Sequence, residues 1–406
     1  GHANKPATLG LWLSLSSSLC RCTWPYIGPP RRTGIRYCHG PDRCCGIYLY
    51  HSESEGEFSV KKQRKNQLST ITDGYRKRQR RYVFTALTLL FLTFALACIM
   101  MIYGNTVYSP KTVLKVLSGE DVEGAVFTIR TLRLPRMLTA ILCGLAFGMA
   151  GTTFPQPLGN PLASPDIIGV TSGASVAAVF GILVLKLNGG TVSLMAVFSG
   201  LLVSALIYFL SQGGGFSNAR LILTGIGMQA FLSAVISWML LKASEYDVAN
   251  ALRWLSGSLN GVKLENVPRL ALVVFGAGGA ILLLNRQLSM LQLGEAHAVT
   301  LGVNVRRFRL TLVRLALRLV AFATSVTGPV ASVAFLSGPI ATRLSGNGKN
   351  GMLTSALTGS TLVLASDLIG QFALPSRYPV GVVTRILGAP YLLFLLLQMI
   401  DKGEHV

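Results

Sequence analysis

The sequence predicts an all-α protein that crosses a membrane about ten times, and two observations lead to this fold class. Of the 406 residues, 51% are hydrophobic and only 13% are charged, whereas a soluble domain carries about 25% charged residues. The charged residues are also clustered, so long apolar runs remain between them. The run at 82–104 contains no charged residue and is long enough to span the ~30 Å hydrocarbon core of a bilayer.

Residues 1–81 precede this run and differ from the rest of the chain. They contain 15 Lys or Arg against 5 Asp or Glu and show neither helical nor strand periodicity. We expect a disordered or non-native N-terminal extension here and a transmembrane domain at 82–406. The basic run at 75–81 directly precedes the first apolar run, and positive residues favour the cytoplasmic side of a membrane. The N-terminus is therefore predicted to be cytoplasmic.

Ten apolar segments follow in order, and each is expected to form a helix that crosses the membrane. They lie at 82–104, 135–154, 166–184, 191–211, 220–242, 267–285, 308–327, 329–343, 352–372 and 381–400. The third and the eighth are short or rich in Gly and Ser, and such small residues let membrane helices approach closely. Because the number of segments is even, the C-terminus is predicted to be cytoplasmic as well.

Two other classes of function fit the composition poorly. The net charge of +21 does not indicate a nucleic-acid partner, because the basic run at 75–81 is what a cytoplasmic flank of a span requires. Five of the seven cysteines fall in the first 45 residues, but no C-x2-C pair occurs among them. Their spacing matches no common zinc site. We therefore expect neither a metal site nor a cofactor.

The stretch Phe154–Ser175 interrupts the apolar pattern with four prolines and three glycines. Irregular backbone at membrane depth is tolerated where it lines a water-filled cavity or is buried in protein. Within this stretch, Ser164 can cap a helix, Pro165 suits a first helical turn, and Asp166 favours the positive end of the helix dipole. The third helix is therefore predicted to begin near Ser164, with 160–162 forming the turn before it.

Several stretches, taken in order, resemble one family of membrane proteins. They are RTLRLPRMLTAILCGLAFGMAGTTF, GNPLASPDIIGVTSGAS, RLILTGIGMQAFLSAVISWML, WLSGSLNG, LGEAHAVTLGVNVRRFRL, TGPVASVAFLSGPIATRLSG and YPVGVVTRILGAPYLLFLL. This series resembles the FecCD-type permeases of bacterial ABC transporters, which import iron–siderophores and cobalamin, and it covers about 82–400. The resemblance implies the type II ABC importer permease fold, and the catecholate (enterobactin-type) members are the most similar.

The resemblance implies a cytoplasmic gate formed by two loops. Its residues would be Asn160, Leu162, Ser217, Asn218 and Ala219. The alternative is a plain turn between helices, because Asn-Pro pairs are common in turns. The sequence departs from the family pattern at Pro155 and Gly159, where the family has Gln and Arg. A proline at 155 can kink the second helix, since it lacks an N–H donor.

The resemblance also implies two surfaces for partner proteins. Carboxylates of a periplasmic binding protein would dock on Arg133, Arg136 and Arg377, because the arginine fork binds carboxylates bidentately. A short segment between the sixth and seventh spans would contact the ATPase through Gly294, Glu295, His297, Leu301 and Gly302. Snorkelling of arginines at helix ends and plain solvation of the loop are the alternatives. Arg314 and Arg318, four residues apart in the seventh span, receive no role.

The predicted function is the permease subunit of an ABC importer that moves a ferric siderophore, of catecholate type, across the bacterial inner membrane. No G-x4-GK[ST] motif occurs, so a pair of separate ATP-binding subunits would hydrolyse ATP and the chain itself would not be an enzyme. The other expected partners are a second, different permease subunit, a periplasmic siderophore-binding protein and the lipid bilayer.

The alternative is a secondary, ion-coupled transporter. Such a protein needs ionisable groups deep in the membrane that pass the coupling ion along. Asp166 and Asp367 are the only carboxylates in the predicted spans, and both lie near helix ends. The ABC permease is therefore the better interpretation of the sequence.

Overall fold

The computed structural model describes residues 54–158, 164–187, 189–211, 218–330, 332–346 and 351–401. The chain divides into two compact units, Gly1–Asp73 and Gly74–Val406. The ten predicted membrane segments all belong to the second unit. Within the described residues, every regular element is a helix and none is a strand. The predicted all-α class is therefore confirmed.

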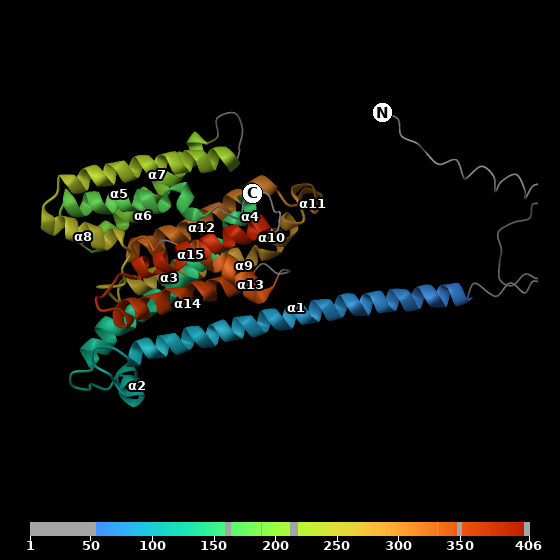
Figure 1. Cartoon of the computed structure of the whole chain (residues 1–406), viewed down its shortest axis with the longest axis horizontal. Helices are drawn as coiled ribbons and strands as arrows, with labels where there is room; N and C mark the ends of the chain where they lie inside the picture. The colour runs from blue at the N-terminus through green and yellow to red at the C-terminus, as the bar shows by residue number, and fades with distance from the viewer. Residues whose placement is uncertain are drawn as a thin grey trace, which may run out of the picture. The chain divides into compact units, whose positions relative to one another are not determined.

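Each of the ten apolar segments forms a helix in the structure (Figure 1). These helices are α1 (Ser54–Ile102), α3 (Leu134–Thr153), α5 (Val170–Leu183), α6 (Gly190–Leu210), α7 (Asn218–Leu241), α9 (Asn266–Leu283), α12 (Val305–Thr327), α13 (Val333–Ser345), α14 (Met352–Leu368) and α15 (Val380–Asp401). Seven helical stretches of the described residues are long and apolar enough to cross a membrane, and α5 is a shorter apolar helix. The structure therefore matches a polytopic membrane protein.

Shorter helices connect the ten, and three of them are not α-helical. The short α-helices are α2 (Pro110–Ser118), α4 (Pro155–Leu158), α8 (Glu245–Leu255), α10 (Asn285–Gln292) and α11 (Glu295–Thr300). The others are the π-helices η1 (Phe127–Arg133) and η3 (Ile369–Ala373) and the 3-10 helix η2 (Pro165–Ile168). Each π-helix directly adjoins an α-helix, η1 before α3 and η3 after α14, and single π-helical turns are frequent at functional sites.

Helix α1 begins at Ser54, whereas the sequence predicted a first helix only from residue 82. Its candidate membrane-spanning part is Asp73–Ile102. Near the start of this part, Arg81 Nε donates a hydrogen bond to the Leu344 carbonyl oxygen at 3.0 Å. The positive side chain therefore lies at the C-terminal end of α13, where the helix dipole favours it. The start of the first span therefore contacts the end of the eighth. The sequence predicted both on the same side of the membrane.

Helix α3 is at the centre of the main core, where α9, α12, α13 and α14 all pack against it. Its glycines let the neighbouring backbones come very close. A Cβ atom at Gly148 would lie 2.8 Å from Ala356 Cα, and one at Gly144 would lie 2.7 Å from the carbonyl carbon of Gly359. Because real Cβ atoms do not approach so closely, only glycine fits these positions. Small residues thus set the α3–α14 contact, as in many membrane helix pairs.

Helices α5, α6, α7 and α8 form a second group, which Figure 1 shows together. Helices α5 and α6 are joined by a hydrogen bond in which Ser199 Oγ donates to the Gly173 carbonyl oxygen at 2.8 Å. Helix α6 also packs against α12. This α6–α12 contact connects the second group to the main core.

A proline follows directly after the end of α3. Helix α3 ends at Thr153, Phe154 forms a turn, and the single helical turn α4 begins at Pro155. Proline lacks the N–H donor that would continue the helical hydrogen bonds. The sequence predicted that Pro155 could kink the second helix, and in the structure it separates α3 from a short α4.

The start of the third helix differs from the prediction. Ser164 has the extended backbone of an N-cap residue, with φ −118° and ψ 156°, but its side chain caps no N–H group. The 3-10 helix η2 follows, and Gly169 then adopts a left-handed conformation with φ +73°. Helix α5 begins only at Val170. A helix does begin after Ser164, as predicted, but it is a 3-10 turn, and the left-handed Gly169 separates it from the α-helix.

Candidate functional sites

A basic hollow of about 940 Å³ lies at one end of the membrane helices. Its lining includes Arg130, Arg133, Arg136, Lys263 and Arg377. Arg130 and Arg133 lie between the first and second predicted spans, and Arg136 lies at the start of the second. Lys263 lies between the fifth and sixth spans, and Arg377 lies before the tenth. A helix count with alternating direction places all of these positions on one side of the membrane. The structure thus brings the three arginines predicted for docking to one surface, which we call the basic hollow.

Arg133 binds the backbone that follows α1. Its Nη1 atom donates to the carbonyl oxygens of Met101 and Ile102 at 2.7 and 3.0 Å. Its Nη2 atom donates to the Thr106 carbonyl oxygen at 2.6 Å. The guanidinium lies so close to Gly104 that a Cβ atom there would be 2.8 Å from Arg133 Cζ. Arg133 therefore fixes the chain between α1 and α2 in addition to lining the basic hollow.

Arg136 forms an ion pair with a buried carboxylate. Its Nε and Nη2 atoms donate to Asp367 Oδ2 and Oδ1 at 2.8 and 2.7 Å, in the bidentate geometry that makes such pairs strong. The Arg136 side chain is 18% exposed and that of Asp367 is 1% exposed. Gln371 Nε2 also donates to Asp367 Oδ2 at 2.6 Å, and Arg136 Nη1 donates to Asn260 Oδ1. These bonds join α3, α14, η3 and the chain before α9.

The other cations of the basic hollow are more accessible. Arg377 is exposed, and its Nη2 atom donates to Asn105 Oδ1 at 2.6 Å. Arg130 and Lys263 are exposed and have no hydrogen-bond or ion-pair partner among the described residues. Both π-helices, η1 and η3, contribute residues to the same surface. The basic hollow therefore presents positive charge beside two π-helical segments.

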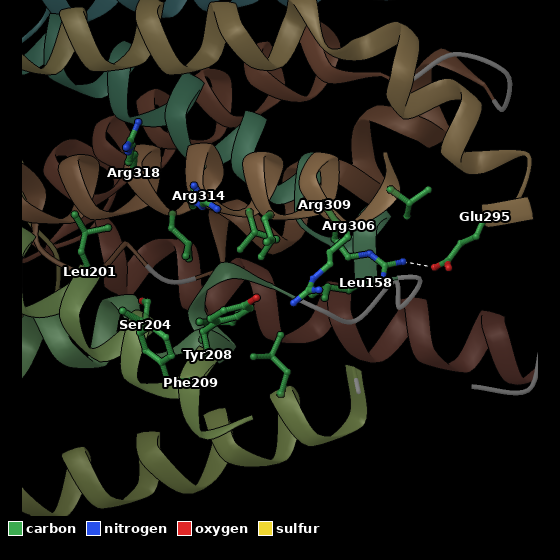
Figure 2. A pocket seen from close by; sticks show the side chains of 17 residues that line it. Leu158, Leu201, Ser204, Tyr208, Phe209, Glu295, Arg306, Arg309, Arg314 and Arg318 are labelled. Carbon is green, nitrogen blue, oxygen red and sulfur yellow. Dashed lines mark hydrogen bonds and ion pairs between the residues drawn. The ribbon is translucent and has the colours of Figure 1, made fainter. Parts of the chain in front are cut away.

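A groove of about 1060 Å³ lies between α6 and α12, and we call it the α6–α12 groove. Arginines of α12 and side chains of α6 line it, as Figure 2 shows. The arginines are Arg306, Arg309, Arg314 and Arg318. Leu201, Ser204, Tyr208 and Phe209 line the α6 side, and Leu158, Ile168 and Leu221 complete the lining with further apolar residues.

One of these four arginines has an acidic partner. Arg309 Nη2 forms an ion pair with Glu295 of α11, drawn as a dashed line in Figure 2. Arg306, Arg314 and Arg318 are exposed and have no hydrogen-bond or ion-pair partner among the described residues. The sequence had singled out Arg314 and Arg318 for their spacing, and the structure places both on this groove.

The segment predicted to contact the ATPase is the short helix α11 with its flanking glycines. Gly294 and Gly302 have φ of +111° and +82°, which is a left-handed backbone that favours glycine. Ala298 is the one buried residue of α11. The exposed side chains include those of Glu295, His297, Val299 and Leu301. Helix α11 therefore presents both polar and apolar groups on a surface between α10 and α12.

Comparison with known proteins establishes the family. The model of the FecCD transport family matches residues 89–398. The chain belongs to the FecCD transport family. Similar FecCD relatives include ferric enterobactin transport system permease protein FepG of Escherichia coli (strain K12), 36% identical over 73% of this chain and 90% of the relative. Achromobactin transport system permease protein CbrC of Dickeya dadantii (strain 3937) is 36% identical over 73% of this chain and 86% of the relative.

A solved structure shares the fold of this FecCD protein. It is described as an inward-facing conformation of a metal-chelate type ABC transporter, and its TM-score is 0.67 at 25% sequence identity. The match covers 78% of this chain and 99% of the solved chain. The FecCD protein therefore has the predicted ABC importer permease fold. It is the permease subunit of an ABC importer and is not itself an enzyme.

The predicted gate of this FecCD permease falls mostly outside the described residues. Asn160, Leu162 and Ser217 lie there. Asn218 begins α7, and Ala219 is exposed at its first turn. Next to the gate loops, Leu158 and Leu221 both line the α6–α12 groove.

Sequence reasoning missed the partners of the arginines predicted for docking. Asp367 was considered only as a possible ion relay, and Asn260 and Gln371 were not considered at all. The signal available in the sequence was a lone carboxylate in an apolar span, which requires a positive partner nearby. The sequence could not show that this partner is Arg136, because the two residues are 231 positions apart.

Proposed function

We propose that this FecCD permease moves a ferric siderophore of catecholate type across the bacterial inner membrane. The single observation that supports this cargo is the 36% identity with FepG, which is named as a ferric enterobactin permease. Other relatives are named for achromobactin, Fe(3+)-citrate and vitamin B12. The cargo of this chain therefore needs a direct measurement.

The proposed transporter contains four kinds of subunit. The chain pairs with a second, different permease subunit, two ATP-binding subunits lie on the cytoplasmic side, and a siderophore-binding protein docks on the periplasmic side. Two relatives from one Escherichia coli strain, FepG and FepD, are both named as permeases of the ferric enterobactin system, which supports a pair of different permeases. In this arrangement both termini are cytoplasmic.

Residues 1–53 of the predicted N-terminal extension at 1–81 lie outside the described residues, and residues 54–81 are helical in α1, so the expected disorder does not hold for them. We propose that the extension is not required by the transmembrane permease domain at 82–406. The FecCD family match begins only at residue 89, and a unit boundary falls at Asp73. Transport should therefore depend on the second unit.

The ATPase contact is proposed to be α11 with its flanking glycines. Its exposed mixture of polar and apolar side chains supports this role, and its ion pair between Glu295 and Arg309 connects it to the start of α12. The gate is proposed to be formed by the loops that contain Asn160, Leu162, Ser217, Asn218 and Ala219.

The periplasmic docking surface is proposed to be the basic hollow with Arg133, Arg136 and Arg377. Arg377 tests this best, because Arg133 and Arg136 also hold the protein's own structure together. Replacing Arg377 by Glu should weaken binding of the periplasmic protein by at least about tenfold, since like charges at an interface are unfavourable. The measurement is surface plasmon resonance on the permease in nanodiscs. Arg286→Glu, an exposed residue of α10, is the control, and equal affinity of the two variants would contradict the proposal.

A secondary, ion-coupled transporter is the less favoured function. Asp367, one of the carboxylates that such a mechanism could use, accepts three hydrogen bonds from Arg136 and Gln371 and is 1% exposed. Because both of its carboxylate oxygens are already bonded within the protein, Asp367 is badly placed to bind and pass on a coupling ion.

The test of function is uptake of radiolabelled ferric catecholate. The host strain lacks its matching permease but retains the ATPase, the other permease and the binding protein. We expect uptake that depends on the added chain and on ATP, and none with a proton-motive force alone. Ferric citrate and vitamin B12 serve as parallel cargoes in strains with their own binding proteins. Uptake of ferric citrate alone, or of vitamin B12 alone, would overturn the catecholate assignment. It would leave the assignment as an ABC importer permease intact.

A further inference from the structure

We propose that the α6–α12 groove binds an anionic phospholipid, with its headgroup phosphate on the arginines of α12. The groove lies between two helices that are long and apolar enough to cross a membrane. Figure 2 shows the arginines on the α12 side and the aromatic residues Tyr208 and Phe209 on the α6 side. The proposal depends on the membrane location and the charge of the groove, and it is independent of the cargo.

The arginines form a positive row on α12. Arg306, Arg314 and Arg318 are eight and four residues apart, which places them within about a third of the helix circumference. At about 1.5 Å per residue, the row extends over roughly 18 Å of the helix axis. It begins at the N-terminal end of α12, where the helix dipole also favours anions.

Within the part of the chain that the structure describes, nothing neutralises Arg306, Arg314 and Arg318. Among the described residues that line the groove, Glu295 is the one acidic residue, and it pairs with Arg309. Arg306, Arg314 and Arg318 have no hydrogen-bond or ion-pair partner among the described residues. Charged residues inside membrane spans are otherwise paired or face water-filled cavities. The positive row is therefore available to an anion from outside the chain.

The rest of the lining is mainly apolar. Leu201 and Phe209 of α6 and Val313 and Leu317 of α12 all line the groove, and Phe209 is 70% exposed. A ligand that fills this space needs an apolar part next to its anionic group. Basic pockets between membrane helices bind the headgroups of anionic lipids at the cytoplasmic side. An anionic phospholipid has both parts, whereas a free anion lacks the apolar one and a zwitterionic lipid lacks the net charge.

The groove also reaches the proposed ATPase contact, because Glu295 of α11 is part of its lining. A lipid in the groove would therefore lie along α12, the same helix that carries Arg309, the partner of Glu295.

The experiment is native mass spectrometry of the purified full chain, titrated with phosphatidylglycerol and, separately, phosphatidylcholine. We expect one saturable phosphatidylglycerol adduct that phosphatidylcholine does not form. The variant Arg314→Gln with Arg318→Gln should bind phosphatidylglycerol roughly tenfold or more weakly, since each basic residue contributes to anionic-lipid attraction. The matched control is Arg286→Gln with Arg307→Gln, which removes two exposed arginines that do not line the groove.

A second variant tests the shape of the groove without changing its charge. Ala205 is exposed and lines the groove, so Ala205→Trp should block the lipid while all four arginines remain. Ala230→Trp, on the exposed surface of α7, is its control. Equal binding of the two phospholipids, or unchanged phosphatidylglycerol binding by both groove variants, would overturn the proposal. Displacement of the lipid by soluble glycerophosphate or by ferric catecholate would also overturn it, because the groove would then be a site for soluble anions.

Discussion

Arginines occupy the membrane helices of this permease in two different ways. Arg136 of α3 forms a bidentate ion pair with Asp367 of α14 and is 18% exposed. Arg314 and Arg318 of α12 are exposed to a groove and pair with no described residue. All three arginines lie within candidate membrane spans. The same residue type can thus join two helices or present positive charge to an external ligand, and the neighbouring helix decides which.

The difference follows from how closely the helices pack. At the α3–α14 contact, glycines bring the two backbones together, so Arg136 of α3 reaches the buried carboxylate of Asp367 on α14 although it also borders the basic hollow. At the α6–α12 contact, a groove of about 1060 Å³ remains beside the arginines. Water, lipid or another ligand can therefore neutralise those charges.

The largest expected effect comes from breaking the buried pair. Replacing Asp367 by Asn leaves the Arg136 charge without its counterion, and removing one partner of such a pair costs about 3–5 kcal/mol. The measurement is the thermal unfolding midpoint of the purified permease in neutral detergent. The double variant Arg136→Leu with Asp367→Leu should recover most of the loss, because no buried charge then remains. An unaltered midpoint for the Asn variant would mean that the pair does not stabilise the fold.

A smaller loss is expected from adding one methyl group to the α3–α14 contact. At Gly148, a Cβ atom would lie 2.8 Å from Ala356 Cα, so Gly148→Ala should destabilise the protein by about 1–3 kcal/mol. Gly276→Ala is the matched control, since a Cβ atom there meets nothing within 4 Å. That control should be neutral or stabilising by up to roughly 1 kcal/mol, because alanine suits a helix better than glycine. Equal destabilisation by both variants would contradict the close contact.

The smallest effect is expected at the arginines without partners. Replacing Arg314 and Arg318 by Leu removes two charges that no described residue neutralises. The free energy of unfolding in neutral detergent, measured through the thermal midpoint, should therefore change by no more than about 0.5 kcal/mol. The same measurement with added phosphatidylglycerol should show less stabilisation of this variant than of the unaltered protein. A large loss in neutral detergent would show that these arginines do have partners within the fold.

Much of the fold was accessible from the sequence, because hydropathy and helix length are local properties. All ten apolar segments form helices, and the segment with Gly294 and Gly302 forms a short, exposed helix as the family resemblance implied. A helix begins after Ser164 as predicted, but it is the 3-10 helix η2 and not α5. Local capping signals there could not reveal the left-handed turn at Gly169 that delays α5.

The candidate sites were accessible only in part. The resemblance selected Arg133, Arg136 and Arg377, and the structure places all three on the basic hollow. It did not reveal that Arg133 binds backbone carbonyl oxygens, or that Arg136 binds Asp367. Those contacts depend on how the helix ends meet, which no short stretch of sequence encodes.

The sequence by itself determined that this protein is a helical, polytopic FecCD permease, because apolar length, charge clustering and ordered motifs are properties of short segments. It also determined that α12 carries a row of arginines. The tertiary structure alone decided which charges are neutralised within the chain. Helices distant in sequence must pack before Arg136 reaches Asp367, or before Arg314 and Arg318 are left facing a groove, since Coulomb attraction and desolvation depend on distances between helices.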